Sequence, residues 1–347
     1  MPPSARLGGF KILKDVVQFS LVFPGEKDQS PAEFFRVIAE GKINLPYITT
    51  INYGHSWGLN IIVENTNEGR TSHLIEEAFG NIFQRNPESA ILSIFPHKKN
   101  PEITGYLLEV FGQEGLKPGS VANSPSTISV VLREEQLSKA SSALFEPFSF
   151  SAYRTPADWK LAQKGKEQLY KEVVASYQEQ RPKVYGLEYH EGQELVQVLS
   201  TCWDVGQTGA AFKEFARLGL YLTFLATGPC QEGGKEKIVF CLPSSKTHEL
   251  GDIVNKTAPD VSVESTSPVT VFSMNGPHFG DRYGIVSELF ASFEKNETDL
   301  LGLGCTIASI TGVVHSRQLE STIQAIQECF EVPSITKIPP NRLSDNF

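Results

Sequence analysis

Cysteine is scarce in this sequence, and its spacing excludes two common kinds of structural site. The 347 residues include five cysteines, and no two of them form a CxxC pair. An odd set without that spacing offers no disulfide framework and no zinc site, and it suits a reducing compartment. The seven histidines are scattered without an HxxxH pair. We therefore predict no metal, no cofactor and a cytoplasmic location.

Long apolar runs and an excess of positive charge are also absent. The longest apolar stretches, such as residues 218–226, are about half as long as a membrane span. Residues 1–14 lack the apolar core of a signal peptide. The net charge is -9, and no stripe of Lys and Arg alternates with aromatic residues, so the chain has no overall attraction for phosphate backbones or anionic lipid. We predict no nucleic-acid partner and no membrane partner.

The residues that are abundant are those of a turn-rich globular protein. Hydrophobic residues make up 40% of the chain and charged residues 20%, with 28 glycines and 21 prolines spread along it. This is not the composition of a disordered protein. A chain of this length usually divides into two or more domains.

An internal repeat organises the chain. A glycine precedes a phenylalanine by six residues at Gly105 and again at Gly284. In both copies a β-rich stretch follows, at residues 127–131 and 309–313, and then a Gln-Leu pair. A third copy has Gly209 six residues before a phenylalanine, and the most diverged first copy has Pro31 in the glycine position. Four copies of one unit therefore cover most of the chain.

Each copy has the pattern strand, helix, strand, strand, helix, strand. Residues 269–274 alternate as a half-buried strand does, and residues 285–293 place apolar side chains on one helical face. The order βαββαβ is the ferredoxin-like plan, an antiparallel sheet with both helices on one face. We predict an α+β protein of four such units in two pairs, at residues 14–85, 86–152, 183–258 and 266–338, with a helical linker at 153–182.

Pairing of the units follows from their size. One unit of about 70 residues has a small core and an open sheet edge, and association of two units relieves both problems. Pairing the first unit with the second and the third with the fourth is the economical arrangement, but the sequence leaves the scheme open.

Three stretches resemble a known family. Residues 274–285 resemble the loop between the first strand and the helix of ACT domains, and residues 305–314 resemble their central strands. Residues 119–131, with residues 136–140, are similar to the regulatory region of aspartate kinases. The resemblance implies tandem ACT domains, which sense amino acids by binding a small effector where two units meet.

The resemblance places two candidate ligand sites. The first comprises Asp281, Arg282, Tyr283, Gly284 and Ile285, with Thr306 and Ile307 nearby; the second comprises Lys99, Asn100, Gly105, Asn123, Ser124 and Ser126. A glycine at a helix start allows close approach, and the exposed N–H groups favour a carboxylate. Asp281 is the expected acceptor for an ammonium group. In the alternative interpretation both glycines serve only helix–sheet packing, and the first and third copies, which depart from the motif, are structural partners.

The resemblance implies a regulatory protein that binds an amino acid and acts allosterically, as a homodimer or with an enzyme partner. Because two repeats occupy residues 1–150, no kinase segment is expected there, and we predict that the chain is not an enzyme. Two alternatives remain open. One is a ligand-free regulatory subunit that docks on a metabolic enzyme through ACT sheet edges. The other is an enzyme with a spatial Cys–His pair such as Cys202 and His190.

Overall fold

The computed structural model describes most of the chain. It covers residues 5–24, 30–54, 56–97, 99–151, 153–163, 181–200, 204–230, 236–244, 253, 261–276, 279, 282–306 and 308–339. Two predicted site residues, Asp281 and Ile307, lie outside the described residues, as do residues 164–180 of the predicted linker.

Four segments of the chain share the order strand, helix, strand, strand. Segment 1 contains β2 (Gly9–Pro24), α1 (Pro31–Glu40), β3 (Tyr47–Asn52) and β4 (Ser56–Glu64). Segment 2 contains β5 (Phe83–Phe95), α3 (Pro101–Gln113), β6 (Ser120–Asn123) and β7 (Ile128–Arg133). Segment 3 contains β9 (Gly186–Ser200), α6 (Val205–Arg217), β10 (Phe224–Pro229) and β11 (Glu236–Pro243). Segment 4 contains β12 (Ser262–Asn275), α8 (Ile285–Lys295), β13 (Leu300–Thr306) and β14 (Ser309–His315).

Shorter elements follow or flank these segments. Helices α2 (Glu68–Phe79), α4 (Leu137–Ala143) and α9 (Leu319–Cys329) follow segments 1, 2 and 4, each after a single 3-10 turn. Strands β1 (Ala5–Leu7) and β8 (Phe148–Phe150) form a separate parallel pair, and β15 (Ile335–Lys337) adds in parallel to β9. Helix α5 (Pro156–Gln163) occupies the start of the predicted linker. The domain boundaries stay predictions.

The strands form one large, mostly antiparallel sheet that closes on itself. It has 13 strands, and within every segment the long first strand pairs with the third, which pairs with the second. The long strands β2 and β5 pair with each other, as do β9 and β12. The second strands pair between distant segments, β3 with β13 and β6 with β10. Segment 1 thus lies beside segment 4, and segment 2 beside segment 3.

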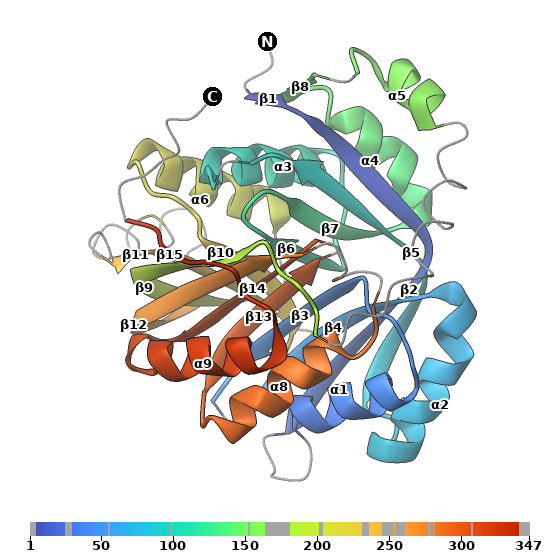
Figure 1. The fold of residues 1–347 in the computed structure, drawn as a ribbon. Helices are drawn as coiled ribbons and strands as arrows, with labels where there is room; N and C mark the ends of the chain where they lie inside the picture. Colours follow the sequence, from blue (N-terminus) through green and yellow to red (C-terminus); the bar gives the residue numbers. More distant parts are fainter. Residues whose placement is uncertain are drawn as a thin grey trace.

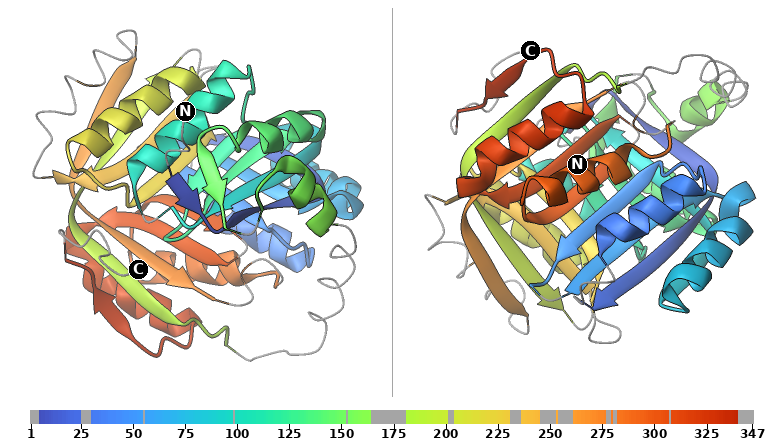
Figure 2. Two further views of the ribbon diagram at one scale, coloured as in Figure 1. Left: turned by 90° about the horizontal axis from the view of Figure 1, so that it is seen from above. Right: turned by 60° about the horizontal axis from the view of Figure 1, so that its bottom comes forward.

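The sheet has an apolar interior and two apolar outer layers. In Figure 1, helices α1, α2, α8 and α9 cover the lower side and α3, α4 and α6 the upper side, and Figure 2 shows the helices outside the strands from two more directions. Along β2, alternate side chains such as Phe19 and Leu21 pack under helices, because successive side chains of a strand point to opposite faces. A separate buried group comes from strands alone and includes Ile51, Val239 and Val313. It fills the space that the sheet encloses.

A buried polar network links three segments inside this enclosure. The side-chain amide of Asn60 donates to Thr49 Oγ1, to Ser120 Oγ and to the carbonyl oxygen of Thr227, at 3.2, 3.3 and 3.1 Å. Tyr47 and Ser120 share a further hydrogen bond of 2.8 Å between their hydroxyl groups. Because a buried polar group is costly when it lacks a partner, the network favours one register of the strands.

The two side-by-side helix pairs are packed differently. Helices α3 and α6 approach through glycines, and a Cβ at Gly209 would lie only 2.6 Å from the carbonyl oxygen of Gly105. Lys213 of α6 and Glu109 of α3 close this contact with an ion pair of 2.8 Å. Helices α1 and α8 instead meet through Phe35 and Phe290, whose ring centroids are 4.9 Å apart. Small residues bring the first pair close, and aromatic rings hold the second pair further apart.

The fold is therefore a mixed α/β fold built around one large sheet. The finer prediction, four ferredoxin-like ACT domains, stays a prediction. Adjacent segments pair through their long strands. Pairing of the long strands leaves the second strand of each segment at an open edge. Those edges are covered across the sequence, β3 of segment 1 by β13 of segment 4 and β6 of segment 2 by β10 of segment 3.

Substituting Gly209 tests the close helix contact. Gly209→Ala should lower the free energy of unfolding by about 1–3 kcal/mol, because the added methyl group has no room against the backbone of α3. Gly69→Ala is the matched control: Gly69 lies in α2 with no atom near its Cβ position, and alanine there should add roughly 0.5–1 kcal/mol. Denaturant unfolding of both variants measures the difference; equal stabilities would contradict the tight crossing.

Candidate functional site

The start of helix α8 differs from the starts of α1, α3 and α6. Those three helices have a side-chain cap, since Ser30, Asn100 and Asp204 each accept a hydrogen bond from a first-turn backbone N–H. Helix α8 begins after Gly284, which has φ +87° and no side chain to cap the helix. Gly284 therefore offers no side-chain cap to the first N–H groups, which, with the helix dipole, favour a negatively charged group.

A pocket opens at this helix start, between segments 1 and 4. It is small, with a cavity volume of about 20 Å³, and it opens to solvent. Segment 1 contributes side chains from the end of α1 to β3: Phe35, Ile38, Ala39, Ile43, Leu45 and Ile48. Segment 4 contributes the loop and first turn of α8: Phe279, Arg282, Tyr283, Gly284, Ile285, Val286 and Ser287. Four predicted site residues, Arg282, Tyr283, Gly284 and Ile285, therefore lie together in one pocket.

The pocket combines an apolar wall with a positive end. The α1 side is aliphatic and aromatic, and Ala39 lies over the glycine, with its Cβ 3.9 Å from where a Cβ of Gly284 would lie. At the other end lie Arg282 and the start of α8, which carries the partial positive charge of a helix N-terminus. Among the described residues, Thr306 does not line the pocket; its hydroxyl group bonds to Ser309 Oγ at 2.9 Å, next to the β13–β14 turn.

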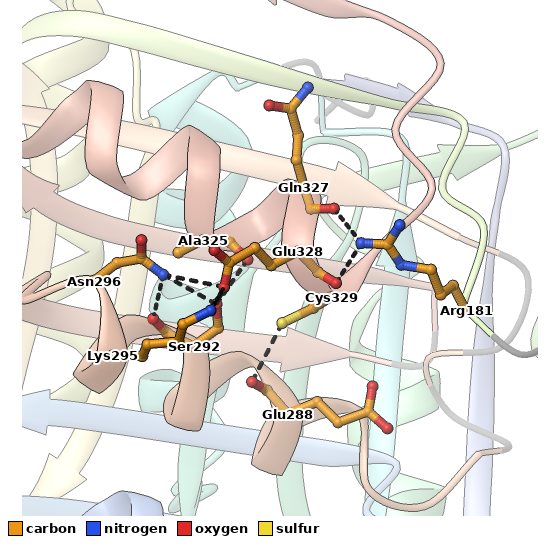
Figure 3. A network of polar contacts seen from close by, with 9 residues as sticks. All are labelled: Arg181, Glu288, Ser292, Lys295, Asn296, Ala325, Gln327, Glu328 and Cys329. Carbon is orange, nitrogen blue, oxygen red and sulfur yellow. Dashed lines mark hydrogen bonds and ion pairs between the residues drawn. The ribbon is translucent and has the colours of Figure 1, made fainter.

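Helix α8 is fastened at its far end to α9. In Figure 3, the carboxylate of Glu328 accepts hydrogen bonds from Ser292 and Asn296 and forms an ion pair with Lys295. All three partners lie on or next to α8. The hydrogen bond from Lys295, helped by Asn296 and Ser292, lowers the pKa of Glu328. Arg181 donates to the carbonyl oxygens of Gln327 and Glu328 at the end of α9. The network holds one end of α8 while the other end borders the pocket.

The residues predicted for the second site make structural contacts. Asn100 Oδ1 caps α3, and Asn123 Oδ1 accepts a hydrogen bond of 2.6 Å from the backbone N–H of Leu225. Ser124 Oγ accepts one from Thr127 N in the turn between β6 and β7, where Ser126 is exposed. Gly105 lies inside α3 against α6 rather than at a helix start.

Lys99 closes the position that corresponds to the pocket. Its carbonyl oxygen accepts a hydrogen bond of 2.9 Å from Leu222 N, so the loop of segment 2 is attached directly to segment 3. Its Nζ lies 2.8 Å from His190 Nε2 and 3.9 Å from the carboxylate of Glu188. Burial lowers the pKa of Lys99, and the nearby Glu188 opposes this shift.

Two buried histidines near this loop, His97 and His190, were not among the predicted ligand contacts. His190 was named only as a partner of Cys202, which lies outside the described residues. His190 accepts from Lys99 through Nε2, and burial together with the lysine charge lowers its pKa to about 3. His97 donates through Nε2 to the carbonyl oxygen of Ser124 at 2.6 Å, and burial lowers its pKa to about 4. The Nδ1 atoms of both rings are buried and have no hydrogen-bond partner among the described residues. No local pattern marks His190, because 91 residues separate it from Lys99.

The described residues also bear on metal binding and on membrane spanning. In the described ranges, no three His, Cys, Asp or Glu side chains gather as a metal would require. None of the helices in this part of the chain is both long enough and apolar enough to cross a bilayer.

The fold resembles solved structures, although no family model and no curated protein sequence matches the chain. Aspartate kinase from Synechocystis aligns over 93% of this chain with a TM-score of 0.77 and 14% sequence identity. The chain spans 56% of the length of that enzyme. The regulatory subunit of aspartate kinase from Thermus thermophilus aligns over 41% of this chain and 99% of its own, with 19% identity, but its TM-score of 0.38 is too low to support an inference. At these identities the likeness is one of fold.

The comparison corrects the prediction that the chain is not an enzyme. The structure that aligns over nearly the whole chain is itself a catalytic enzyme. The prediction was wrong because it inferred from the repeats, which leave no room for a kinase segment, that the chain has no part in an enzyme. The same fold occurs within a kinase. The cytoplasmic location and the homodimer or enzyme partner stay predictions.

The buried histidines predict how stability depends on pH. Their folded-state pKa values, about 3 for His190 and about 4 for His97, lie below the ordinary value of 6.5. The unfolded chain therefore binds more protons in acid, and stability that is complete above pH 6.5 is lost as the pH falls below it. Each histidine should contribute up to about 1.4 kcal/mol per pH unit to this loss.

Denaturant unfolding at intervals of about one pH unit, from roughly pH 4.5 to 8, measures this loss of stability. His97→Gln and His190→Gln should each reduce the slope below pH 6.5 relative to the unsubstituted chain. The control is His73→Gln, because the His73 side chain is 77% exposed. Unchanged slopes in the two buried variants would contradict their neutral, buried state.

Proposed function

We propose that this chain is the amino-acid-sensing regulatory region of an aspartate-kinase-type enzyme, and that its four segments are ferredoxin-like ACT domains. The repeated strand, helix, strand, strand order and the identical pairing of strands within each segment support this. The likeness of fold to the Synechocystis aspartate kinase over 93% of the chain supports it as well. The enzyme partner is the catalytic segment of such a kinase, in the same or another polypeptide.

The observation that carries the proposal is the pocket at the start of α8, where Gly284 offers no capping side chain. An α-amino acid would place its carboxylate at the N–H groups of Ile285 and the residues after it, near Arg282. Its side chain would then lie against the α1 side of the pocket. Asp281, which lies outside the described residues, keeps its predicted role as the acceptor for the ammonium group.

The position of the pocket suggests how binding acts at a distance. The pocket walls come from segments 1 and 4, so a ligand contacts both and favours the arrangement in which they are close. An effector shifts an equilibrium only through different affinities for its two states. The long strands β2 with β5 and β9 with β12 connect these segments to segments 2 and 3, so a change between segments 1 and 4 reaches the whole sheet.

Thermal or denaturant unfolding with the common amino acids tests the proposal. An amino acid present at 100 times its Kd should stabilise the chain by about 2.7 kcal/mol. The absence of stabilisation by every common amino acid at millimolar concentration would contradict the proposal and favour a ligand-free docking subunit.

A pair of glycine substitutions locates the site. Gly284→Ala should cost about 1–2 kcal/mol, because alanine resists the left-handed conformation, and should remove most of the amino-acid-dependent stabilisation. Gly219→Ala is the matched control: it has φ +68°, with open space around it, after helix α6. It should show a similar loss of stability but keep the response to the amino acid. Equal responses in both variants would place the ligand elsewhere.

A further inference from the structure

Lys99 holds an amine in a partly buried position between segments 2 and 3. Its backbone has φ +56°, a left-handed conformation that is uncommon for residues other than glycine. Its carbonyl oxygen accepts the hydrogen bond of 2.9 Å from Leu222 N. The side chain reaches β9 and is 22% exposed. The backbone thus fixes where this side chain starts, and the remaining exposure leaves the amine open to a small reagent.

The amine of Lys99 has an imidazole where two other lysines have a carboxylate. Its Nζ lies 2.8 Å from His190 Nε2, whereas the carboxylate of Glu188 is 3.9 Å away, beyond hydrogen-bond distance. Lys213 and Lys295, in contrast, form ion pairs of 2.8 and 3.0 Å with carboxylates. Because a carboxylate in direct contact stabilises an ammonium group, the charged form of Lys99 has less support than theirs.

The titratable groups around Lys99 are mostly uncharged near neutral pH. Burial lowers the pKa of His97, on the same loop, to about 4 and that of His190, on β9, to about 3. Tyr221, which precedes β10 and has its ring centroid 6.2 Å from that of His190, has a pKa raised by burial. Glu188 supplies the negative charge, yet burial still lowers the pKa of Lys99. More of this amine is therefore neutral than in a fully solvated lysine.

We propose that Lys99 is an acylation site, at which the amine takes a small acyl group from an activated donor, an acyl phosphate or a thioester. A neutral amine that donates one N–H to His190 Nε2 keeps its lone pair for the acyl carbon. The new C–N bond forms, and the bond from the acyl carbon to the phosphate oxygen or the thioester sulfur breaks. The leaving group takes that electron pair, and the surplus proton of the nitrogen passes to the leaving group or to water.

Acylation changes the charge where segments 2 and 3 meet. The product is a neutral amide, so the attraction of Lys99 to Glu188 ends. The backbone hydrogen bond from Leu222 to Lys99 does not involve the amine and remains. This modification site is independent of the amino-acid site proposed above, and neither depends on the other.

Site-specific acylation rates of the folded, full chain test the proposal. The chain is incubated at about pH 7.5 with acetyl phosphate in one arm and with the thioester S-acetylcysteamine in the other, and peptide mass spectrometry gives the rate at each lysine. Lys213 is the matched control, because its side chain is 23% exposed but directly paired with Glu109. Lys99 should react at least roughly fivefold faster than Lys213 in one arm or both, and the faster arm identifies the donor. A rate at Lys99 no higher than at Lys213 in both arms would overturn the proposal.

A charge substitution tests the cause of the reactivity. Glu188→Gln removes the carboxylate that favours the ammonium form and should raise the acylation rate of Lys99 by about twofold to fivefold, the range expected for a partly exposed ion pair. The Glu188 side chain is 42% exposed, so the variant should fold. Glu331→Gln removes an equal charge beside Lys183 and should leave the rate at Lys99 unchanged. An unchanged or lower rate at Lys99 in Glu188→Gln would speak against a neutral amine and refute the proposal.

Discussion

The rest of the structure depends on how the open edges of four small sheets are covered. Each segment leaves its second strand exposed at an edge, and an unpaired edge is both unstable and prone to association. Here β3 pairs with β13 and β6 pairs with β10, so that segments far apart in the sequence become neighbours. These two contacts close the sheet around an apolar interior and set α1 beside α8 and α3 beside α6. The pocket at the start of α8 and the Lys99 contact each lie at one of these two helix pairs.

The two helix pairs have the same arrangement but different side chains, and this difference separates their roles. Glycines at the α3–α6 contact remove the side chains that would hold the helices apart, and the ion pair of Lys213 with Glu109 closes the contact. Phenylalanine rings at the α1–α8 contact occupy more space. One end of that contact therefore stays open as a pocket, while the equivalent place in the other pair is bridged by backbone.

The polar groups inside the protein support this geometry. Asn60 and its partners connect strands of segments 1, 2 and 3 where the sheet encloses them. A shift in strand register would leave several buried donors without acceptors, which costs more than the hydrogen bonds themselves contribute. The same argument applies to Lys99 and His190, whose contact holds the loop of segment 2 against β9. The interior thus keeps the four segments in the positions from which the pocket is built.

By itself, the sequence determined the repeated elements and the local conformation at the start of α8. Apolar periodicity marks each strand and helix, and a glycine before an amphipathic helix indicates the backbone that Gly284 adopts. The family resemblance of residues 274–285 pointed to Arg282, Tyr283 and Ile285, which line the pocket. Tertiary structure decided what the sequence could not. Gly105 has the same spacing as Gly284 but lies within a helix that begins one turn earlier, where its lack of a side chain serves contact with α6. Which edges pair, and that Lys99 meets His190, depend on contacts between residues far apart in the chain, and no local pattern records such contacts.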